Sequence, residues 1–193
     1  MALSADGNTL YNLPSYHMGI QYIRPDSHEE PVQNLWQIIA TNWFPVAGGY
    51  RYGFKAPILN NDNMPDIIVI QVQPQAGHQN PDPRNPNDWT ERQIMLIECK
   101  RPSLDTPGGW HNTIDGQFED DCSQTLNPSQ RIFGAVAIGR SVQFFQVDAT
   151  VPVGGAGRRV PLSGILDLDN NADFITMTQR MDQVKNQGWA WAS

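Results

Sequence analysis

Two short apolar runs in the middle of the chain constrain its fold more than any other feature. The first is residues 66–73 (DIIVIQVQ), and the second is residues 94–97 (IMLI), which continues into residues 98–100 (ECK). Both have the length and β-branched or apolar content of strands. The intervening residues 74–90 are polar and rich in proline, which predicts a loop. We expect an antiparallel pair, with the start of the first strand beside the end of the second.

Charged side chains stand where these two strands would meet. Asp66 opens the first, while Glu98 and Lys100 close the second, two residues apart and so on one face. Cys99, between them, would point into the core. Two carboxylates and the Cys99 backbone carbonyl offer hard oxygen ligands, which favour Mg²⁺ or Mn²⁺ over Zn²⁺. We therefore predict a metal on these three groups, with Lys100 orienting a water or stabilising developing charge.

Hydrophobic periodicity predicts the remaining elements. In chain order they are a helix near 28–43, a strand over 50–59, a helix over 110–126, strands over 132–138 and 142–147 joined at Gly139, and a helix near 171–187. The crossover through 110–126 should add a parallel neighbour to the sheet. We expect an α/β fold, with a central mixed sheet of four to five strands flanked by helices. Residues 1–26 are expected to be an irregular arm, and residues 27–193 a single domain.

The motif and the order of elements together resemble a known superfamily. Pro65-Asp66 followed by Glu98-Cys99-Lys100 resembles the signature of the PD-(D/E)XK, or restriction-endonuclease-like, superfamily, over roughly residues 27–147. The resemblance implies a metal-dependent phosphodiesterase, an endonuclease with DNA rather than RNA as the expected substrate. It also implies a Mg²⁺ or Mn²⁺ cofactor and catalytic roles for the carboxylates and the lysine. A homodimer would suit double-strand cutting.

The resemblance points to two further positions. Many members carry a glutamine on the following helix, often as Gln-x-x-x-Tyr, and Gln117 fits its start with Asp121 in place of the tyrosine. Some members place a metal-binding glutamate on the first helix, which maps to Glu29 or Glu30. Glu30 also completes a capping box with Ser27, so a metal role and a capping role both stay open for it.

Three arginines are candidate nucleic-acid contacts. Arg101 directly follows the motif, and Arg158 and Arg159 lie on a glycine-rich segment expected to be a flexible loop. Each could contact a phosphate. A salt bridge explains Arg101 equally well, and exposed loop charges such as Arg158 and Arg159 usually make no specific contact.

The charge balance supports an alternative function. The net charge is −7, the opposite sign to that of most nonspecific nucleic-acid binders. The 110–126 helix contributes four of the acids and no lysine or arginine: Asp115, Glu119, Asp120 and Asp121. A catalytically inactive nuclease-fold module that binds nucleic acid or protein is therefore the second hypothesis.

The remaining composition bounds the location of the protein. Two cysteines do not make a disulfide framework, and the histidines share no zinc-site spacing. The N-terminus lacks a signal-peptide pattern, and no run of 18 apolar residues occurs. We expect an intracellular protein, cytoplasmic or nuclear, without a membrane partner.

Overall fold

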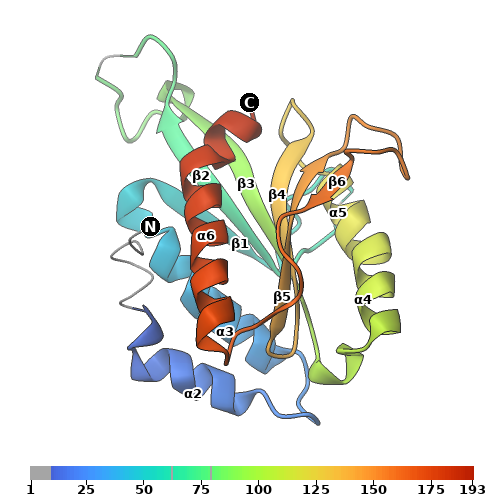
Figure 1. Ribbon diagram of the computed structural model, residues 1–193. Helices are drawn as coiled ribbons and strands as arrows, with labels where there is room; N and C mark the ends of the chain where they lie inside the picture. Colours follow the sequence, from blue (N-terminus) through green and yellow to red (C-terminus); the bar gives the residue numbers. More distant parts are fainter. Residues whose placement is uncertain (1–9, 62, 79) are drawn as a thin grey trace.

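The computed structural model describes residues 10–193 apart from 62 and 79. Within this range seven strands form one mixed sheet (Figure 1). The strands are β1 (Tyr50–Phe54), β2 (Ile67–Pro74), β3 (Trp89–Lys100), β4 (Arg131–Ile138), β5 (Ser141–Asp148), β6 (Arg159–Pro161) and β7 (Leu166–Asp167). The predicted α/β class and mixed sheet are confirmed. The predicted count of four to five strands is wrong, because the short β6 and β7 both pair with β5.

The sheet order is β1-β2-β3-β4-β5-β6, with β7 also on β5. Neighbours are antiparallel except β3 and β4, which run parallel from Met95 opposite Phe133 to Lys100 opposite Ile138. The parallel pair is the one predicted from the helical crossover, since a chain that leaves the end of β3 must return before β4 can run alongside it. Gly139, at φ +60°, turns the β4–β5 hairpin where a Cβ would lie 3.1 Å from Pro102 Cα.

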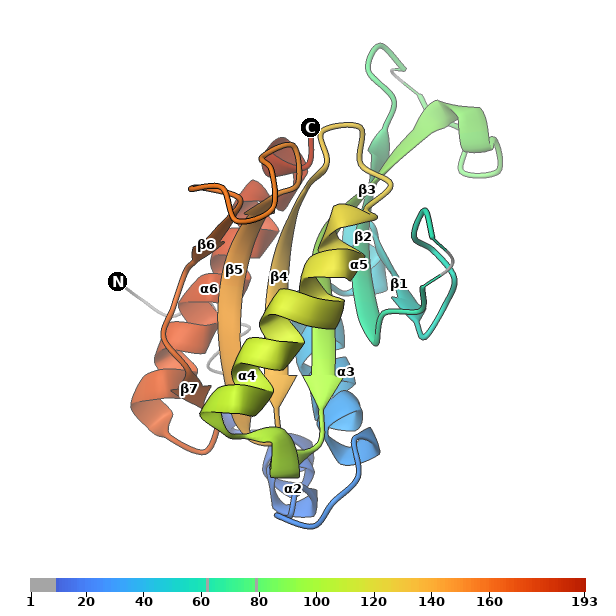
Figure 2. The same ribbon diagram turned by 90° about the vertical axis from the view of Figure 1, so that its right-hand side faces the viewer.

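Helices cover both faces of the sheet, as predicted (Figure 2). They are α2 (Pro14–Tyr22), α3 (Glu30–Trp43), α4 (Pro107–Thr113), α5 (Glu119–Ser123) and α6 (Asn171–Trp191), with shorter turns η1 (Val46–Gly48), η2 (Pro86–Asp88), η3 (Pro102–Leu104) and the π-helical η4 (Ile114–Phe118). Helices α2, α3 and α6 share one apolar core with Ile67 and Val69, and α4, η4 and α5 share a second with Ile68 and Ile70. Strand alternation therefore divides the core into two layers.

The expected irregular arm contains a helix within its described part, residues 10–26; residues 1–9 lie outside the described residues. Helix α2 begins with Pro14 in its first turn, and Tyr16 and Ile20, one turn apart, are buried. The Tyr16 hydroxyl donates to the Leu168 carbonyl at 2.8 Å, and its ring contacts Phe174 edge-on. The prediction of an irregular segment is wrong here, because only two buried residues one turn apart, Tyr16 and Ile20, mark the helix among Ser, Pro and Gly residues.

The predicted capping box does not form. Ser27 Oγ instead accepts from the Arg24 N–H and donates to the Tyr22 carbonyl. Helix α3 begins at Glu30 without a side-chain cap. Pro31 accounts for the later start, because proline fits only the first helical turn.

Several element bounds also differ from expectation. Strand β1 ends at Phe54 because Lys55 takes φ +42°. The helix expected at 110–126 occupies 107–123 in three parts, and a kink at Gly116 interrupts it. Helix α6 continues past 187 to Trp191, and Gly188 within it lies against Ile94, where a Cβ would come within 2.9 Å.

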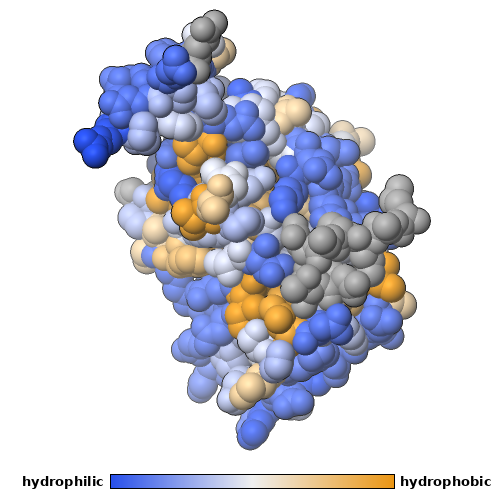
Figure 3. All heavy atoms as spheres, turned by 90° about the vertical axis from the view of Figure 1, so that its left-hand side faces the viewer, coloured by the Kyte–Doolittle hydropathy of each residue, from blue (hydrophilic) through white to orange (hydrophobic). Residues whose placement is uncertain are grey.

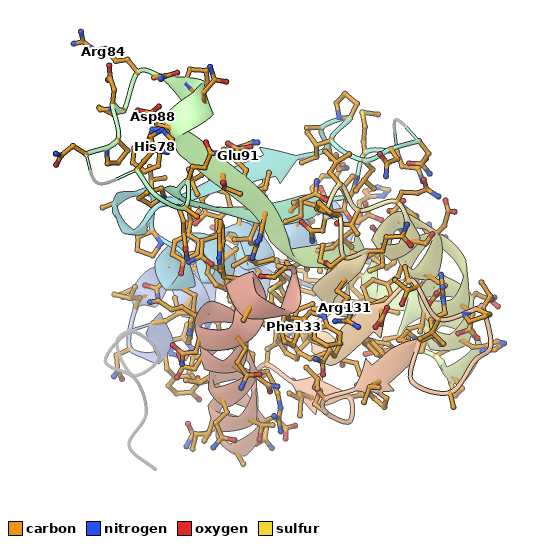
Figure 4. All side chains as sticks on the ribbon, turned by 90° about the horizontal axis from the view of Figure 1, so that it is seen from above. His78, Arg84, Asp88, Glu91, Arg131 and Phe133 are labelled. Atoms are coloured by element: carbon orange, nitrogen blue, oxygen red, sulfur yellow. The ribbon has the colours of Figure 1, made fainter. Side chains whose placement is uncertain are left out.

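Two surface features lie away from the strand ends that carry the motif. The β2–β3 connection projects from the opposite end of the sheet, with Arg84 far out on it and His78 Nε2 3.7 Å from Asp88 Oδ1 (Figure 4). The face of α2 and α3 shows separate apolar patches among hydrophilic side chains (Figure 3). A groove of about 470 Å³ there includes Met18 and Tyr22 in its lining.

Candidate metal-and-lysine site

The structure brings Asp66, Glu98 and Lys100 together at adjacent strand ends. The register of β2 and β3 pairs Ile67 with Ile97, so Asp66 falls beside Glu98. Asp66 Oδ2 accepts a hydrogen bond from the Cys99 N–H at 2.7 Å. The Cys99 side chain is buried in the opposite core, as its place between two site residues predicted.

The α3 side of the site is built from Glu29 and Gln33. The Gln33 amide nitrogen donates to Glu29 Oε1 at 2.6 Å and to Asp66 Oδ1 at 2.7 Å. Of the two glutamates to which the resemblance maps, Glu30 is exposed, and Glu29 is the one that shares the Gln33 donor with Asp66. The reason is helical phase, because Glu29 lies one turn before Gln33 on the face that meets the sheet.

The other side of the site is built from Lys100 and Gln117. Lys100 Nζ donates to Glu98 Oε1 and, at 2.9 Å, to Gln117 Oε1. It also lies 4.0 Å from Glu29 Oε2. Gln117 therefore reaches the site as the resemblance implied.

Lys55 and Gln33 are two site residues that sequence reasoning missed. Lys55 Nζ lies 3.9 Å from both Glu29 Oε1 and Asp66 Oδ1. A hairpin between the strand at 50 and the strand at 66 would have brought Lys55 to Asp66. Gln33 could have been found as the residue one turn after Glu29.

The electrostatics of the site favour protons or a cation on its acids. Burial raises the pKa of Asp66 to about 6, although the hydrogen bond from Cys99 N–H opposes it. Burial and the nearby Asp66 raise the pKa of Glu98 to about 8. Burial acts to lower the pKa of Lys100, but its hydrogen-bonded partner Glu98 outweighs it and raises that pKa. Keeping two buried carboxylates charged costs free energy, and a bound cation would offset much of that cost.

The oxygen donors of the site, although not their present arrangement, are of the kind that binds a hard divalent cation. Glu98 is completely buried, and its Oε2 has no hydrogen-bond partner within the part of the chain that the structure describes. Carboxylate oxygens of Asp66, Glu98 and Glu29 are the ligand type that Mg²⁺ and Mn²⁺ prefer. Over residues 10–193, apart from 62 and 79, no three His, Cys, Asp or Glu side chains are grouped closely enough to hold a metal ion as they stand. Gln33, Cys99 N–H and Lys100 engage the other carboxylate oxygens of Asp66 and Glu98.

The predicted phosphate contact at Arg158 is wrong because the side chain is buried, and Arg159 is paired with acidic side chains. Arg158 is buried; it pairs with Glu119 and donates to the carbonyls of Ala149 and Val151. Arg159 pairs with Asp115 and Glu119. These pairs line a pocket of about 500 Å³, together with Gly154 and Gly155.

Arg158 and Arg159 form ion pairs with acidic residues about forty positions earlier in the chain, and no local sequence pattern predicts such a pairing. The third candidate, Arg101, is exposed directly after β3.

In the described residues, every helix is too short or too polar to cross a membrane. Comparison with protein-family models, curated proteins and solved structures found no match to this chain.

Proposed function

We propose that this protein is a metal-dependent phosphodiesterase of the PD-(D/E)XK kind, an endonuclease with DNA as its expected substrate. One observation carries the proposal. Asp66, Glu98 and Lys100 meet at adjacent strand ends, and the completely buried Glu98 keeps Oε2 without a partner among the described residues. A buried carboxylate oxygen without a donor is costly unless something binds it.

The cation would be Mg²⁺ or Mn²⁺, held by Asp66, Glu98 and the Cys99 carbonyl. The N–H and C=O of a strand residue face the same edge of the strand, and the Cys99 N–H already faces Asp66. When bound, such a cation supplies Lewis-acid stabilisation of a phosphoryl oxygen.

Lys100 supplies the positive group of the proposed reaction. Its ammonium is held by Glu98 and Gln117, and its side chain is 18% exposed, so it is both fixed and accessible. From there it would orient the attacking water and stabilise the negative charge that develops on phosphorus-bound oxygens. Arg101, next along the chain and exposed, would hold a neighbouring phosphate.

The arrangement of elements supports the same assignment. The superfamily order of helix, three strands, helix and strand corresponds to α3, β1–β3, α4–α5 and β4. Its motif belongs on the second and third of those strands, which here are β2 and β3.

A plasmid-cleavage assay tests the proposal. Wild-type protein with Mg²⁺ or Mn²⁺ should nick or linearise supercoiled plasmid, and EDTA should abolish the reaction. Lys100→Ala should lose at least about 100-fold of the rate, the size of effect expected for one preorganised charge-stabilising group. Lys185→Ala, on α6 outside the site, is the matched control and should cleave as wild type. Equal rates for wild type and Lys100→Ala would contradict the proposal.

One observation favours the alternative of a non-catalytic nuclease-fold module. Both Asp66 oxygens already accept hydrogen bonds, from Gln33 and from Cys99 N–H, and Glu98 Oε1 accepts from Lys100. A module of this kind would bind nucleic acid or a protein without cutting. Calorimetric titration separates the two functions. No heat of Mg²⁺ or Mn²⁺ binding, or binding that survives Asp66→Ala, would favour the non-catalytic module.

Double-strand cutting would bring two copies of this site together. Light scattering of the protein with and without a DNA duplex tests that homodimer directly. One protein chain per particle both without DNA and in the complex with the duplex would argue against the homodimer.

A further inference from the structure

Asp121 is a second buried carboxylate with an unused oxygen. It is completely buried on α5. Asn63 Nδ2 donates to its Oδ1 at 2.7 Å, and its Oδ2 has no hydrogen-bond partner in the portion of the chain described. A buried carboxylate with one oxygen bound and one left open is costly by itself, so the open oxygen points to a missing partner.

Asp121 and Glu98 lie on the same side of the sheet, and Lys100 and Gln117 connect the elements that carry them. Glu98 follows Leu96 by two residues on β3 and so shares its face, which is the face that α4, η4 and α5 cover (Figure 2). Lys100 joins Glu98 to Gln117 by hydrogen bonds, and Asp121 lies one helical turn beyond Gln117. The negative charge of Asp121 is close enough to raise the pKa of Glu98.

Asn63 fixes the orientation of the Asp121 carboxylate through hydrogen bonds to Asp120 and Asp121. Asn63 Nδ2 donates to Asp120 Oδ2 at 3.0 Å as well as to Asp121 Oδ1, so it ties the β1–β2 connection to α5. Asp120 itself is exposed. Asn63 is therefore a positioning residue that leaves Asp121 Oδ2 on the buried side.

We propose that Asp121 binds a divalent cation together with Glu98, on the α5 side of the site. The inference rests on the proposed cation-dependent function and extends its ligand set. Asp121 stands where the Gln-x-x-x-Tyr pattern has a tyrosine, so this chain replaces a neutral phenol with a carboxylate. An all-oxygen pair of this kind suits Mn²⁺, Mg²⁺ or Ca²⁺ rather than Zn²⁺.

Calorimetric titration with MnCl₂, without nucleic acid, tests the inference. Wild type is compared with Asp121→Asn, Glu98→Gln, Asp66→Asn and the matched control Asp120→Asn. Asp121→Asn keeps the side-chain shape and can still accept from Asn63. It should weaken Mn²⁺ binding at least about tenfold, on the order of the loss seen when the groups around a metal are altered. Asp120→Asn should bind within about twofold of wild type.

Each result has a distinct meaning. Wild-type Mn²⁺ affinity in Asp121→Asn, with weak binding in Glu98→Gln and Asp66→Asn, would overturn the inference and leave the proposed function standing. Weak binding in Asp121→Asn and Glu98→Gln, with full binding in Asp66→Asn, would support the inference and remove Asp66 from the ligands. No Mn²⁺ binding by wild type would overturn both.

A folding control keeps the test valid. Each variant is first unfolded thermally in EDTA, and only variants that show a cooperative transition well above the temperature of the titration are titrated. If Asp121→Asn fails to fold, Asp121→Ser takes its place. Asn63→Ala gives an independent readout, because it should weaken Mn²⁺ binding by misplacing Asp121 without removing a carboxylate. Wild-type affinity in both Asn63→Ala and the Asp121 variant would overturn the proposal.

Discussion

The Asp66 carboxylate accepts a hydrogen bond from the backbone N–H of Cys99, with 2.7 Å between Oδ2 and nitrogen. This contact joins Asp66, which directly precedes β2, to the middle residue of Glu98-Cys99-Lys100 on β3. Gln33 donates to the other oxygen, Oδ1. Two donors from different elements therefore fix the orientation of a carboxylate that is 7% exposed.

Replacing Gln33 should destabilise the protein through Asp66. In Gln33→Leu, Asp66 Oδ1 and Glu29 Oε1 both lose their shared donor. Urea unfolding at pH 7 should show a loss of about 1–3 kcal/mol, the usual cost of a buried unsatisfied polar group. The loss should be smaller at pH 5, because burial raises the pKa of Asp66 to about 6 and the carboxyl is then mostly protonated.

Gln37→Leu, one turn later on α3, is the matched control. Gln37 is not part of the hydrogen-bonded cluster, so its replacement should change the free energy of unfolding by less than about 0.5 kcal/mol. Equal losses in Gln33→Leu and Gln37→Leu would mean that helix packing, rather than the Asp66 contact, sets the cost.

Glu98 should make the metal-free protein less stable as the pH rises. Burial raises its pKa to about 8, so between about pH 5 and pH 8 the native state binds a proton that the unfolded state has released. Stability then falls with rising pH, with a limiting slope of about 1.4 kcal/mol per pH unit for one proton. Glu98→Gln removes this proton and should flatten the dependence in EDTA, and at pH 8 it should be more stable than wild type.

Glu91→Gln is the control for that measurement. The hydrogen bond from Arg51 lowers the pKa of Glu91, so its proton linkage lies below the ordinary range of a glutamate. Urea unfolding from pH 5.5 to 8.5 should give Glu91→Gln the wild-type slope. A wild-type slope in Glu98→Gln would show that Glu98 does not hold the proton.

The local sequence was enough to place the motif on its strands. The β-branched run that starts at Asp66 and the proline that follows Lys100 and Arg101 mark strand ends within a few residues. The length of the crossover before β4 then decided the parallel pair. These features are local in the chain, and so a sequence pattern carries them.

The partners of the site residues depend on phase and on long-range packing. Pro31 fixes the start of α3, and a one-residue difference there turns Glu29 rather than Glu30 toward Asp66. The role of Arg158 depends on Glu119, which is 39 residues earlier and reaches it through tertiary packing. Neither relation leaves a periodic signal in the sequence.

Arg158 and Arg101 should separate stability from nucleic-acid binding. Arg158→Met leaves Glu119 with only Arg159 and frees two backbone carbonyls, so the free energy of unfolding should fall by about 3 kcal/mol. Arg101→Met, at an exposed position, should change it by less than about 0.5 kcal/mol.

The Arg101→Met variant also tests the proposed phosphate contact. In a Lys100→Ala background, which prevents cleavage, fluorescence anisotropy with a DNA duplex should show weaker binding for Arg101→Met. The slope of log affinity against log salt should fall by about one. An unchanged salt slope would remove Arg101 from the proposed interface.

Gly134 on β4 provides the space for the Phe118 ring, and filling that space should destabilise the fold. A Cβ at Gly134 would lie 2.5 Å from Phe118 Cζ, and Phe118 is completely buried. Gly134→Ala should therefore cost about 1–3 kcal/mol in urea unfolding, the range for overpacking a core. Gly108→Ala, in the first turn of α4 with no atom within 4 Å of the added Cβ, should be neutral or stabilising by up to about 1 kcal/mol. Adding Phe118→Leu to Gly134→Ala should recover part of the loss, and strict additivity of the two changes would show that the ring and the glycine are not in contact.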